Sequence, residues 1–250
     1  MPRPTSASRL LDTWEQGLGQ PQALQALAFL QWARPDAERA ALERLTIGQR
    51  NAELLALRQQ LFGPDLAALA SCPNCGETLD LSFRTADIRT PPPPLTDERV
   101  GGEILHEGHR VQFRPPDTAD LLAVGQVADA AAFRQALLAR CVDAPLDTLP
   151  GALLDEIVAR MAEADPGADV QLNLTCPACV HAWQAPFDIA SFLWREVDDW
   201  AGRTLREVHL LASAYGWREA DILGLSAQRR QHYLDMIWPL YTSDAADDQL

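Results

Sequence analysis

The chain has 250 residues, 47% of them hydrophobic, which is enough to bury a substantial core in one elaborate domain or two smaller ones. Its 35 acids against 21 bases give a net charge of −14, which disfavours a general role on nucleic acid or on an anionic membrane. No stretch approaches the roughly 18 uninterrupted apolar residues of a membrane span, and no apolar signal segment is found at the N-terminus. We therefore expect an acidic, soluble, cytoplasmic protein.

The first part of the sequence, residues 1–66, is predicted to be helical. Apolar residues have helical spacing in residues 10–18 and again in residues 23–32. Thr46 and Gln49 have the separation of a capping box, so a further helix is expected to begin there and to carry the leucines that follow. Gly63-Pro64 is expected to end it.

Two cysteine pairs share the form C-P-x-C, Cys72-Pro73-Asn74-Cys75 and Cys176-Pro177-Ala178-Cys179. Each such turn suits two of the four thiolates of a tetrahedral zinc site, and two turns complete it. After each pair, apolar residues alternate with polar ones, which is the pattern of a strand. We therefore predict one structural zinc ion in a ribbon of two halves, residues 67–90 and 170–188. Its ligands are Cys72, Cys75, Cys176 and Cys179.

Other interpretations of the cysteine pairs stay open, namely redox chemistry and a degenerate site without metal. In glutaredoxin-like redox proteins the same turn opens a helix, whereas here strand patterns follow it. Disulfides would need an oxidising compartment. The fifth cysteine, Cys141, is expected to be a small buried thiol. His181 could contact the metal shell, or it could simply be the first residue of the returning strand.

Residues 91–169 are predicted to form a small mixed insertion between the two halves of the ribbon. Four prolines at 91–94 indicate a stiff, extended spacer. Residues 104–113 have the pattern of a hairpin that turns at Glu107-Gly108, so the histidines on either side are expected on a turn rather than at a metal. Asp117 is expected to cap a helix, and helical patterns near 130–140 and 152–161 complete the insertion.

The last part, residues 189–240, is predicted to contain three helices, over 189–200, over 205–215, and after a cap at Ser226. Residues 205–225 superficially resemble a helix-turn-helix, but acids on the second helix would face DNA phosphates badly. Residues 241–250 are polar, acidic and unpatterned, and are expected to be a disordered or non-native tail. The expected class is α+β, mainly helical, with helical N- and C-terminal parts around a zinc ribbon that a small mixed α/β insertion interrupts.

No catalytic constellation is recognisable in the sequence. It has no glycine-rich phosphate loop after a strand and no serine in a G-x-S-x-G elbow. A zinc site with four cysteines has no open position for a substrate. We therefore expect a protein that binds partners and is not an enzyme. Arg229 and Arg230 are candidates for that binding, because guanidinium groups make paired contacts with carboxylates.

Short blocks, in order along the chain, carry a family resemblance. They include Trp14-Glu15, Ile47-Gly48-Gln49-Arg50, Phe62-Gly63, Cys72-Pro73-Asn74-Cys75-Gly76, Phe113-Arg114-Pro115-Pro116-Asp117, Asp120-Leu121-Leu122, Cys176-Pro177-Ala178-Cys179, Phe192-Leu193-Trp194, Glu207-Val208-His209, Tyr215-Gly216-Trp217 and Tyr233-Leu234. In these blocks the sequence resembles the zinc-knuckle family of baseplate and baseplate-hub assembly chaperone proteins from contractile-tailed phages and related injection systems.

The resemblance implies a non-enzymatic protein that helps to build a baseplate or hub, with other baseplate or hub proteins as its partners. It brings no catalytic residues to carry over. The sequence departs from a usual ribbon knuckle at Val180, where glycine is common. The alternative function is that of a zinc-ribbon adaptor or regulator that binds nucleic acid or a protein partner.

Overall fold

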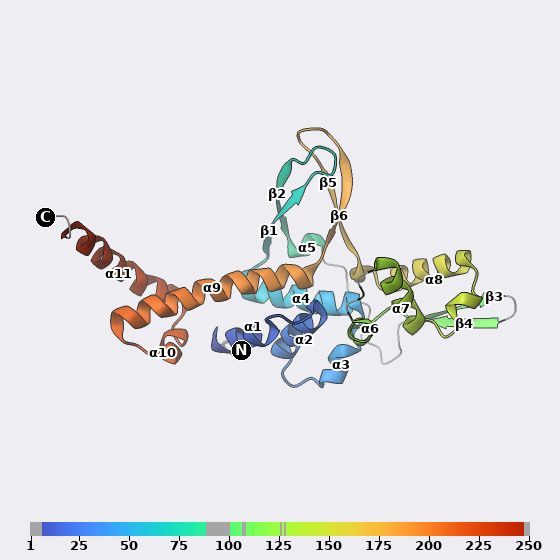
Figure 1. The fold of residues 1–250 in the computed structure, drawn as a ribbon, viewed down its shortest axis with the longest axis horizontal. Helices are drawn as coiled ribbons and strands as arrows, with labels where there is room; N and C mark the ends of the chain where they lie inside the picture. The colour runs from blue at the N-terminus through green and yellow to red at the C-terminus, as the bar shows by residue number, and fades with distance from the viewer. Residues whose placement is uncertain (1–6, 89–100, 107–108, 126, 128, 248–250) are drawn as a thin grey trace. The chain divides into compact units, whose positions relative to one another are not determined.

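The computed structural model describes residues 7–88, 101–106, 109–125, 127 and 129–247. Most of them are helical, and the strands form small antiparallel sheets, which confirms the predicted α+β, mainly helical class (Figure 1). The chain divides into two compact units, residues 1–20 with 194–250 and residues 21–193. Each unit is described in turn.

The described residues of the first unit form four helices around an apolar cluster. They are α1 (Ala7–Gly17), most of α9 (Ile189–Tyr215), α10 (Glu219–Leu223) and α11 (Ala227–Asp247). The buried members of the cluster are Leu11, Ala201, Val208, Leu211, Ile222, Leu223 and Ile237. At the turn after α9, the rings of Tyr215, Trp217 and Tyr233 contact one another. The periodic apolar residues of the sequence therefore face a common core.

One prediction for this unit is wrong. The expected helices over 189–200 and 205–215 are a single helix of 27 residues, α9. A glycine inside a helix, here Gly202, weakens it by about 1 kcal/mol but does not break it. Ala201 and Thr204 on either side are buried, so packing offsets that loss. The final helix also continues beyond residue 240, to Asp247, into the segment that was expected to be a tail.

The second unit contains the N-terminal helices α2 (Gln22–Ala33), α3 (Arg39–Glu43) and α4 (Ile47–Phe62). Leu27 and Leu30 of α2 and Leu54 and Leu57 of α4 are buried, as their helical spacing predicts. The capping box at the start of α4 is confirmed: Thr46 Oγ1 accepts from the N–H of Gln49 at 3.2 Å, and Gln49 Oε1 accepts from the N–H of Thr46 at 3.0 Å. Gly63 follows the last turn with φ 90°, a left-handed conformation that favours glycine.

Two hairpins project together from the helices of this unit (Figure 1). The first pairs β1 (Asp65–Ser71) with β2 (Thr78–Arg84), and the helix α5 (Thr85–Ile88) follows it. The second pairs β5 (Val170–Thr175) with β6 (Ala182–Phe187). The strands predicted after each cysteine pair, β2 and β6, are confirmed. Strand β1 was not predicted, because its alanines give only a weak apolar alternation.

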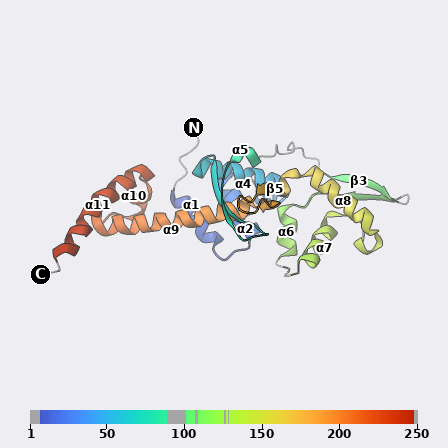
Figure 2. The same cartoon turned by 90° about the horizontal axis from the view of Figure 1, so that it is seen from above.

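The insertion between the hairpins has its own apolar core. It contains the hairpin of β3 (Gly102–His106) and β4 (His109–Phe113), then α6 (Thr118–Val124), α7 (Ala130–Cys141) and α8 (Gly151–Ala164), with short 3₁₀ turns η1 (Leu146–Thr148) and η2 (Pro166–Ala168). Figure 2 shows α6, α7 and α8 grouped with β3. The buried residues are Ile104, Val111, Phe113, Cys141, Val142, Leu153, Ile157 and Met161.

The predictions for the insertion mostly hold. Its hairpin and helices form where they were expected, and Asp117 caps α6, because its carboxylate accepts from the N–H of Asp120 at 2.9 Å. Cys141 is buried, 4% exposed, as predicted. The prolines at 91–94 and the turn at Glu107-Gly108 lie outside the described residues.

Candidate metal centre

The two C-P-x-C turns form the tips of the two hairpins and have the same backbone geometry. In the first turn, the N–H of Gly76 donates to Cys72 O at 2.9 Å and the N–H of Cys72 donates to Glu77 O at 2.8 Å. In the second, the N–H of Val180 donates to Cys176 O and that of Cys176 donates to His181 O, both at 2.9 Å. Each turn therefore presents its two sulfur atoms on the same side.

The residue after each pair lies in the left-handed region of backbone conformation. Gly76 has φ 77°, which glycine adopts without strain. Val180 has φ 59° and is the only non-glycine residue with positive φ in the described part of the chain. A left-handed β-branched residue is strained by about 1–2 kcal/mol. The second turn thus keeps the knuckle geometry in spite of its unusual residue, whose side chain is 77% exposed.

The four sulfur atoms lie close together. Cys72 Sγ is 3.7 Å from Cys179 Sγ, Cys75 Sγ is 3.6 Å from Cys176 Sγ, and all four are within 4.8 Å of one another. A tetrahedral zinc ion with bonds of about 2.3 Å places its sulfur ligands about 3.8 Å apart. A disulfide needs about 2.05 Å, and all five cysteines are free. The cluster therefore fits a tetrahedral metal ion.

The surroundings of the sulfurs also suit a cation. The side-chain amide of Asn74 donates to Cys179 Sγ at 3.5 Å and, with the N–H of His181, lowers the pKa of Cys179 to about 6. For Cys75 the largest single influence, the N–H of Glu77, lowers the pKa, but the neighbouring sulfurs and desolvation outweigh it and raise the pKa to about 12. Four adjacent thiolates repel one another unless a cation lies between them.

The histidines do not extend the cluster. His181 directly precedes β6, and its ring stacks on Trp183 with 6.1 Å between the centroids. His106 and His109 are partners in the backbone register of the β3–β4 hairpin, as expected for residues that flank a turn. Within the described residues, the four cysteines are the only group of three or more His, Cys, Asp or Glu residues close enough to share a metal.

The fifth cysteine lies outside the cluster, in the core of the insertion. Cys141 Sγ is 3.8 Å from Asp120 Oδ2, and burial together with that carboxylate raises the pKa of the thiol to about 12. A thiol with so high a pKa is a packing residue rather than a nucleophile.

The two arginines predicted to contact a partner have different environments. Arg229 is exposed on α11, and its N–H donates to the cap at Ser226 Oγ. Arg230 is 4% exposed and is engaged within its own unit: its Nε lies 2.8 Å from Glu207 Oε2, and Nη1 donates to Leu225 O at 2.9 Å. A guanidinium held this way contributes to the fold of its own unit, and the contact of Arg229 and Arg230 with a partner stays a prediction.

Sequence reasoning missed two buried carboxylates in the second unit. Asp120, 1% exposed, lies between Arg114, whose Nη2 is 3.0 Å from Oδ1, and Arg140, whose Nε is also 3.0 Å from Oδ1. These partners lower the pKa of Asp120 to about 2 in spite of desolvation, which acts in the opposite direction. In the sequence, only the position of Asp120 three residues after the cap Asp117 indicates a structural role. No pattern in the sequence indicates that the other carboxylate, Asp165, is buried.

No helix among the described residues is long and apolar enough to span a membrane. No curated protein and no solved structure shows a significant match to the chain. A protein-family comparison does match: residues 34–194 fit the family described as T4 bacteriophage base plate protein. The matched region contains α4, both hairpins with all four cysteines, and the insertion between them. The chain belongs to the T4 bacteriophage base plate protein family.

Proposed function

We propose that this protein is a non-enzymatic assembly or structural component of a phage-like contractile tail, with a chaperone-like role at the baseplate or its hub. The observation that carries the proposal is the family match over residues 34–194, which covers the whole of the paired hairpins and their insertion. The ordered blocks of the sequence that resemble baseplate-hub assembly chaperones support the finer role. Its partners would then be baseplate or hub proteins, met in the host cytoplasm during assembly.

A structural zinc ion is the second part of the proposal. The sulfur–sulfur distances of 3.7 Å and 3.6 Å between the two turns support it, because a tetrahedral zinc ion places its sulfur ligands about 3.8 Å apart. Zinc would join two hairpins whose cysteines are 101 to 107 residues apart along the chain. With four protein ligands, the ion would have no open position for a substrate, so it would stabilise the fold and catalyse nothing.

Co-expression tests the role in assembly. The protein is produced with hub and baseplate proteins of the same tail, and complexes are isolated through a tag on this chain. We expect a stoichiometric complex with at least one tail protein. Binding to duplex DNA that weakens steeply with salt, with no tail protein recovered, would instead support the nucleic-acid adaptor, which the net charge of −14 disfavours.

A further inference from the structure

The hairpins β1–β2 and β5–β6 are separate two-stranded sheets. Each of their strands therefore has one edge that no other strand covers in the described part of the chain. Natural proteins protect such edges with proline, charge or a bulge. Strand β6 contains Pro186, which cannot donate to an added strand, whereas β5 reads Val-Gln-Leu-Asn-Leu-Thr and has neither a proline nor a charge. The edge of β5 is thus open to pairing.

A groove runs beside this edge, with about 1320 Å³ of empty space that includes its open side. Residues 169–174 form one wall and residues 80–83 of β2 form the other, with Asp87, Ile88 and Pro166 also in the lining. Successive residues of a strand point to opposite faces, so a wall of consecutive residues is a strand edge and not a sheet face. Neither β1 nor β6 contributes to the lining. The groove therefore separates the edges of β2 and β5.

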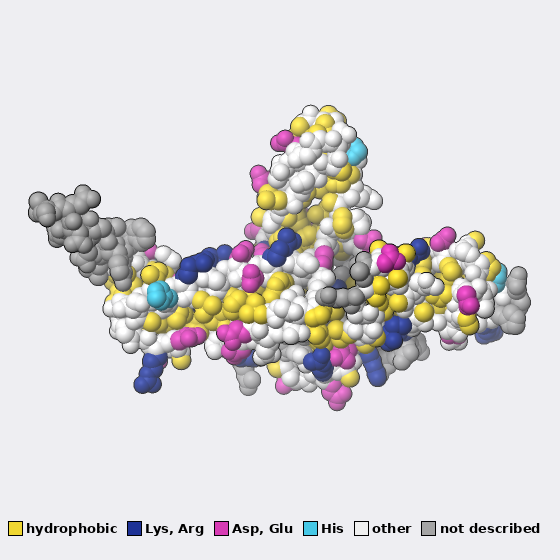
Figure 3. All heavy atoms as spheres, viewed as in Figure 1, with side chains coloured by type: hydrophobic (Ala, Val, Ile, Leu, Met, Phe, Trp, Pro, Cys, Tyr) yellow, Lys and Arg dark blue, Asp and Glu magenta, His cyan; other side chains and the backbone are white. Residues whose placement is uncertain are grey.

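The apolar side chains between the hairpins are only half-buried. They are Leu79, Leu81 and Phe83 on β2 and Val170, Leu172 and Leu174 on β5. The hairpins meet at the tip, through the cysteines, and at the base, where the rings of Phe83 and Phe187 are 5.6 Å apart. In Figure 3 hydrophobic side chains line the projecting hairpins along the space between them. An added apolar side chain in this space would bury surface that now faces water.

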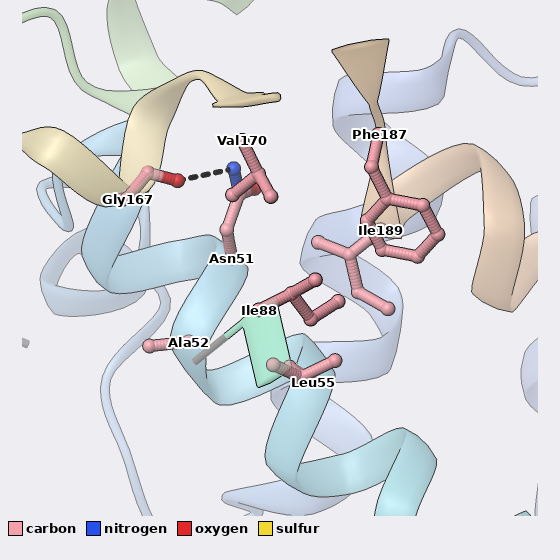
Figure 4. Close-up of a pocket in the computed structure, with 9 residues that line it drawn as sticks. Asn51, Ala52, Leu55, Ile88, Gly167, Val170, Phe187 and Ile189 are labelled. Carbon is pink, nitrogen blue, oxygen red and sulfur yellow. Dashed lines mark hydrogen bonds between the residues drawn. The ribbon is translucent and has the colours of Figure 1, made fainter. Parts of the chain in front are cut away.

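The groove continues at its base into a smaller apolar pocket. Ile88 and Val170 line both, and Leu55, Phe187 and Ile189 complete the apolar wall of the pocket. Figure 4 shows these side chains converging on the same space. The polar side chain nearby, Asn51, is already bonded, because its Nδ2 donates to Gly167 O at 3.0 Å. The pocket therefore gives the groove a small apolar end.

The rim of the groove carries negative charge only. Asp80 on β2, Asp87 after it and Asp169 before β5 are exposed and belong to the lining, which contains no arginine, lysine or histidine among the described residues. Both hydrogen-bond donors to these carboxylates are neutral. The backbone N–H of Arg84 donates to Asp87, and the side-chain amide of Gln171 donates to Asp169. Their charge therefore remains available for a cationic ligand.

We propose that the groove binds an extended, basic segment of a partner tail protein, which pairs as an added β-strand with the free edge of β5. Alternate apolar side chains of the segment enter the space between the hairpins, and its arginines or lysines face Asp80 and Asp169. Main-chain hydrogen bonds provide affinity and the pockets provide specificity. The identity of the partner rests on the proposed function. The chain's own residues 91–94 are a poor alternative, since four prolines have no N–H to donate.

The test uses overlapping peptides of about 12 residues from hub and baseplate proteins of the same tail, long enough to pair with all six residues of β5. Binding to the full chain is measured by fluorescence anisotropy. We expect a peptide with alternating apolar residues and arginine or lysine to bind. Leu81→Arg, inside the groove, should weaken binding at least about tenfold. The matched control is Leu105→Arg on β3, because Leu105 is 72% exposed and lies outside the groove.

Two further measurements keep the test decisive if Leu81→Arg impairs folding. A double variant at two exposed positions, Asp80→Lys with Asp169→Lys, should lower the affinity for the same peptide about tenfold. This variant should also bind acidic peptides in preference to basic ones. In addition, N-methylation of alternate peptide residues should abolish binding in one register and leave it unchanged in the other, because only alternate N–H groups face β5. Equal effects in both registers would overturn strand addition.

Other outcomes would also overturn the inference. They are the absence of any binding peptide and equal losses of affinity with Leu81→Arg and the Leu105→Arg control. A gain in peptide affinity when a glycine-serine linker replaces residues 89–100 would also count against it, as would a dimer of this chain that Leu81→Arg dissociates. The failure can be distinguished from failure of the proposed function. If the co-expressed complex persists with Leu81→Arg, the role in assembly still stands and only the proposed binding at the groove is refuted.

Discussion

The carboxylate of Asp165 accepts a hydrogen bond at 2.8 Å from the backbone N–H of Gly48, which precedes it by 117 residues. Gly48 is in the first turn of α4, where backbone N–H groups have no partner within the helix. Asp165 is 2% exposed, and burial raises the pKa of its carboxyl group. The contact therefore joins the end of the insertion to the N-terminus of α4, and Asn51 adds a second bond to Gly167.

We expect Gly48→Ala to destabilise the second unit by about 1–3 kcal/mol, the usual effect of forcing an added group into a packed site. A methyl group on Gly48 would overlap the Asp165 carboxylate, and the backbone of residue 168 is also near. The matched control is Gly151→Ala at the start of α8, where the added methyl group meets nothing within 4 Å. Urea unfolding measures both variants. Equal stability of the two would contradict the close approach.

Zinc is predicted at one equivalent per chain, measurable by elemental analysis of the purified protein. Cys176→Ser should remove the metal and lower the melting temperature strongly, since the binding free energy of a structural zinc is part of the folding free energy. Cys141→Ala is the control: it perturbs the core of the insertion but should retain the zinc. Protein that lacks metal as purified and melts at the same temperature after addition of zinc would refute a structural site.

The Asp120 cluster predicts a specific dependence of stability on pH. The pKa of Asp120 is lowered to about 2, against about 3.9 for an unfolded chain. Its ionised form therefore contributes about 2–3 kcal/mol at pH 7, and this contribution is lost as the pH falls from about 4 towards 2. Asp120→Asn should be much less stable than the native protein at pH 7, and the difference should shrink over that acidic range.

Asp155→Asn provides the comparison for Asp120. Asp155 is 3.7 Å from Arg134, but its side chain is 78% exposed. Exposed ion pairs contribute about 0–1 kcal/mol, so this variant should differ little from the native protein at any pH. A destabilisation by Asp120→Asn that does not change between pH 7 and pH 2 would contradict the assigned pKa.

Local features of the fold can be predicted from the sequence. The capping boxes at Thr46 and Asp117 depend on residues three positions apart, and each strand after a cysteine pair depends on simple alternation. The approach of the four cysteines can also be predicted, because a tetrahedral metal site needs four ligands and each turn supplies two.

Contacts between distant segments could not be predicted in the same way. Nothing near Asp165 in the sequence indicates that its carboxylate caps a helix 117 residues away. The continuity of α9 through Gly202 depends on packing against neighbouring helices, which outweighs the low helix propensity of glycine. The contact of Arg230 with Glu207 could not be predicted for the same reason, since Glu207 comes from another helix.

The strained turn at Val180 gives a reciprocal prediction. Val180→Asn should stabilise the protein by about 1 kcal/mol, because asparagine tolerates the left-handed conformation better than a β-branched residue does. The equivalent position of the first turn provides the opposite variant, Gly76→Val, which should destabilise the protein by about 1–2 kcal/mol and weaken zinc retention against a chelator. Thermal unfolding of both variants with zinc bound measures the effect. A Val180→Asn variant no more stable than the native protein, or a Gly76→Val variant no less stable, would contradict the prediction.

The neighbouring arginines of α11 should separate stability from partner binding. Arg230→Ala would leave Glu207, 28% exposed, without its ion-pair partner, and should destabilise the first unit by about 3 kcal/mol. Arg229→Ala removes an exposed side chain but keeps the backbone N–H that donates to Ser226, so stability should change by less than about 0.5 kcal/mol. If Arg229 contacts a tail partner, its variant should weaken the co-expressed complex at an unchanged melting temperature. If the complex forms normally with Arg229→Ala, or is lost only with the destabilised Arg230→Ala variant, the two arginines do not contact the partner.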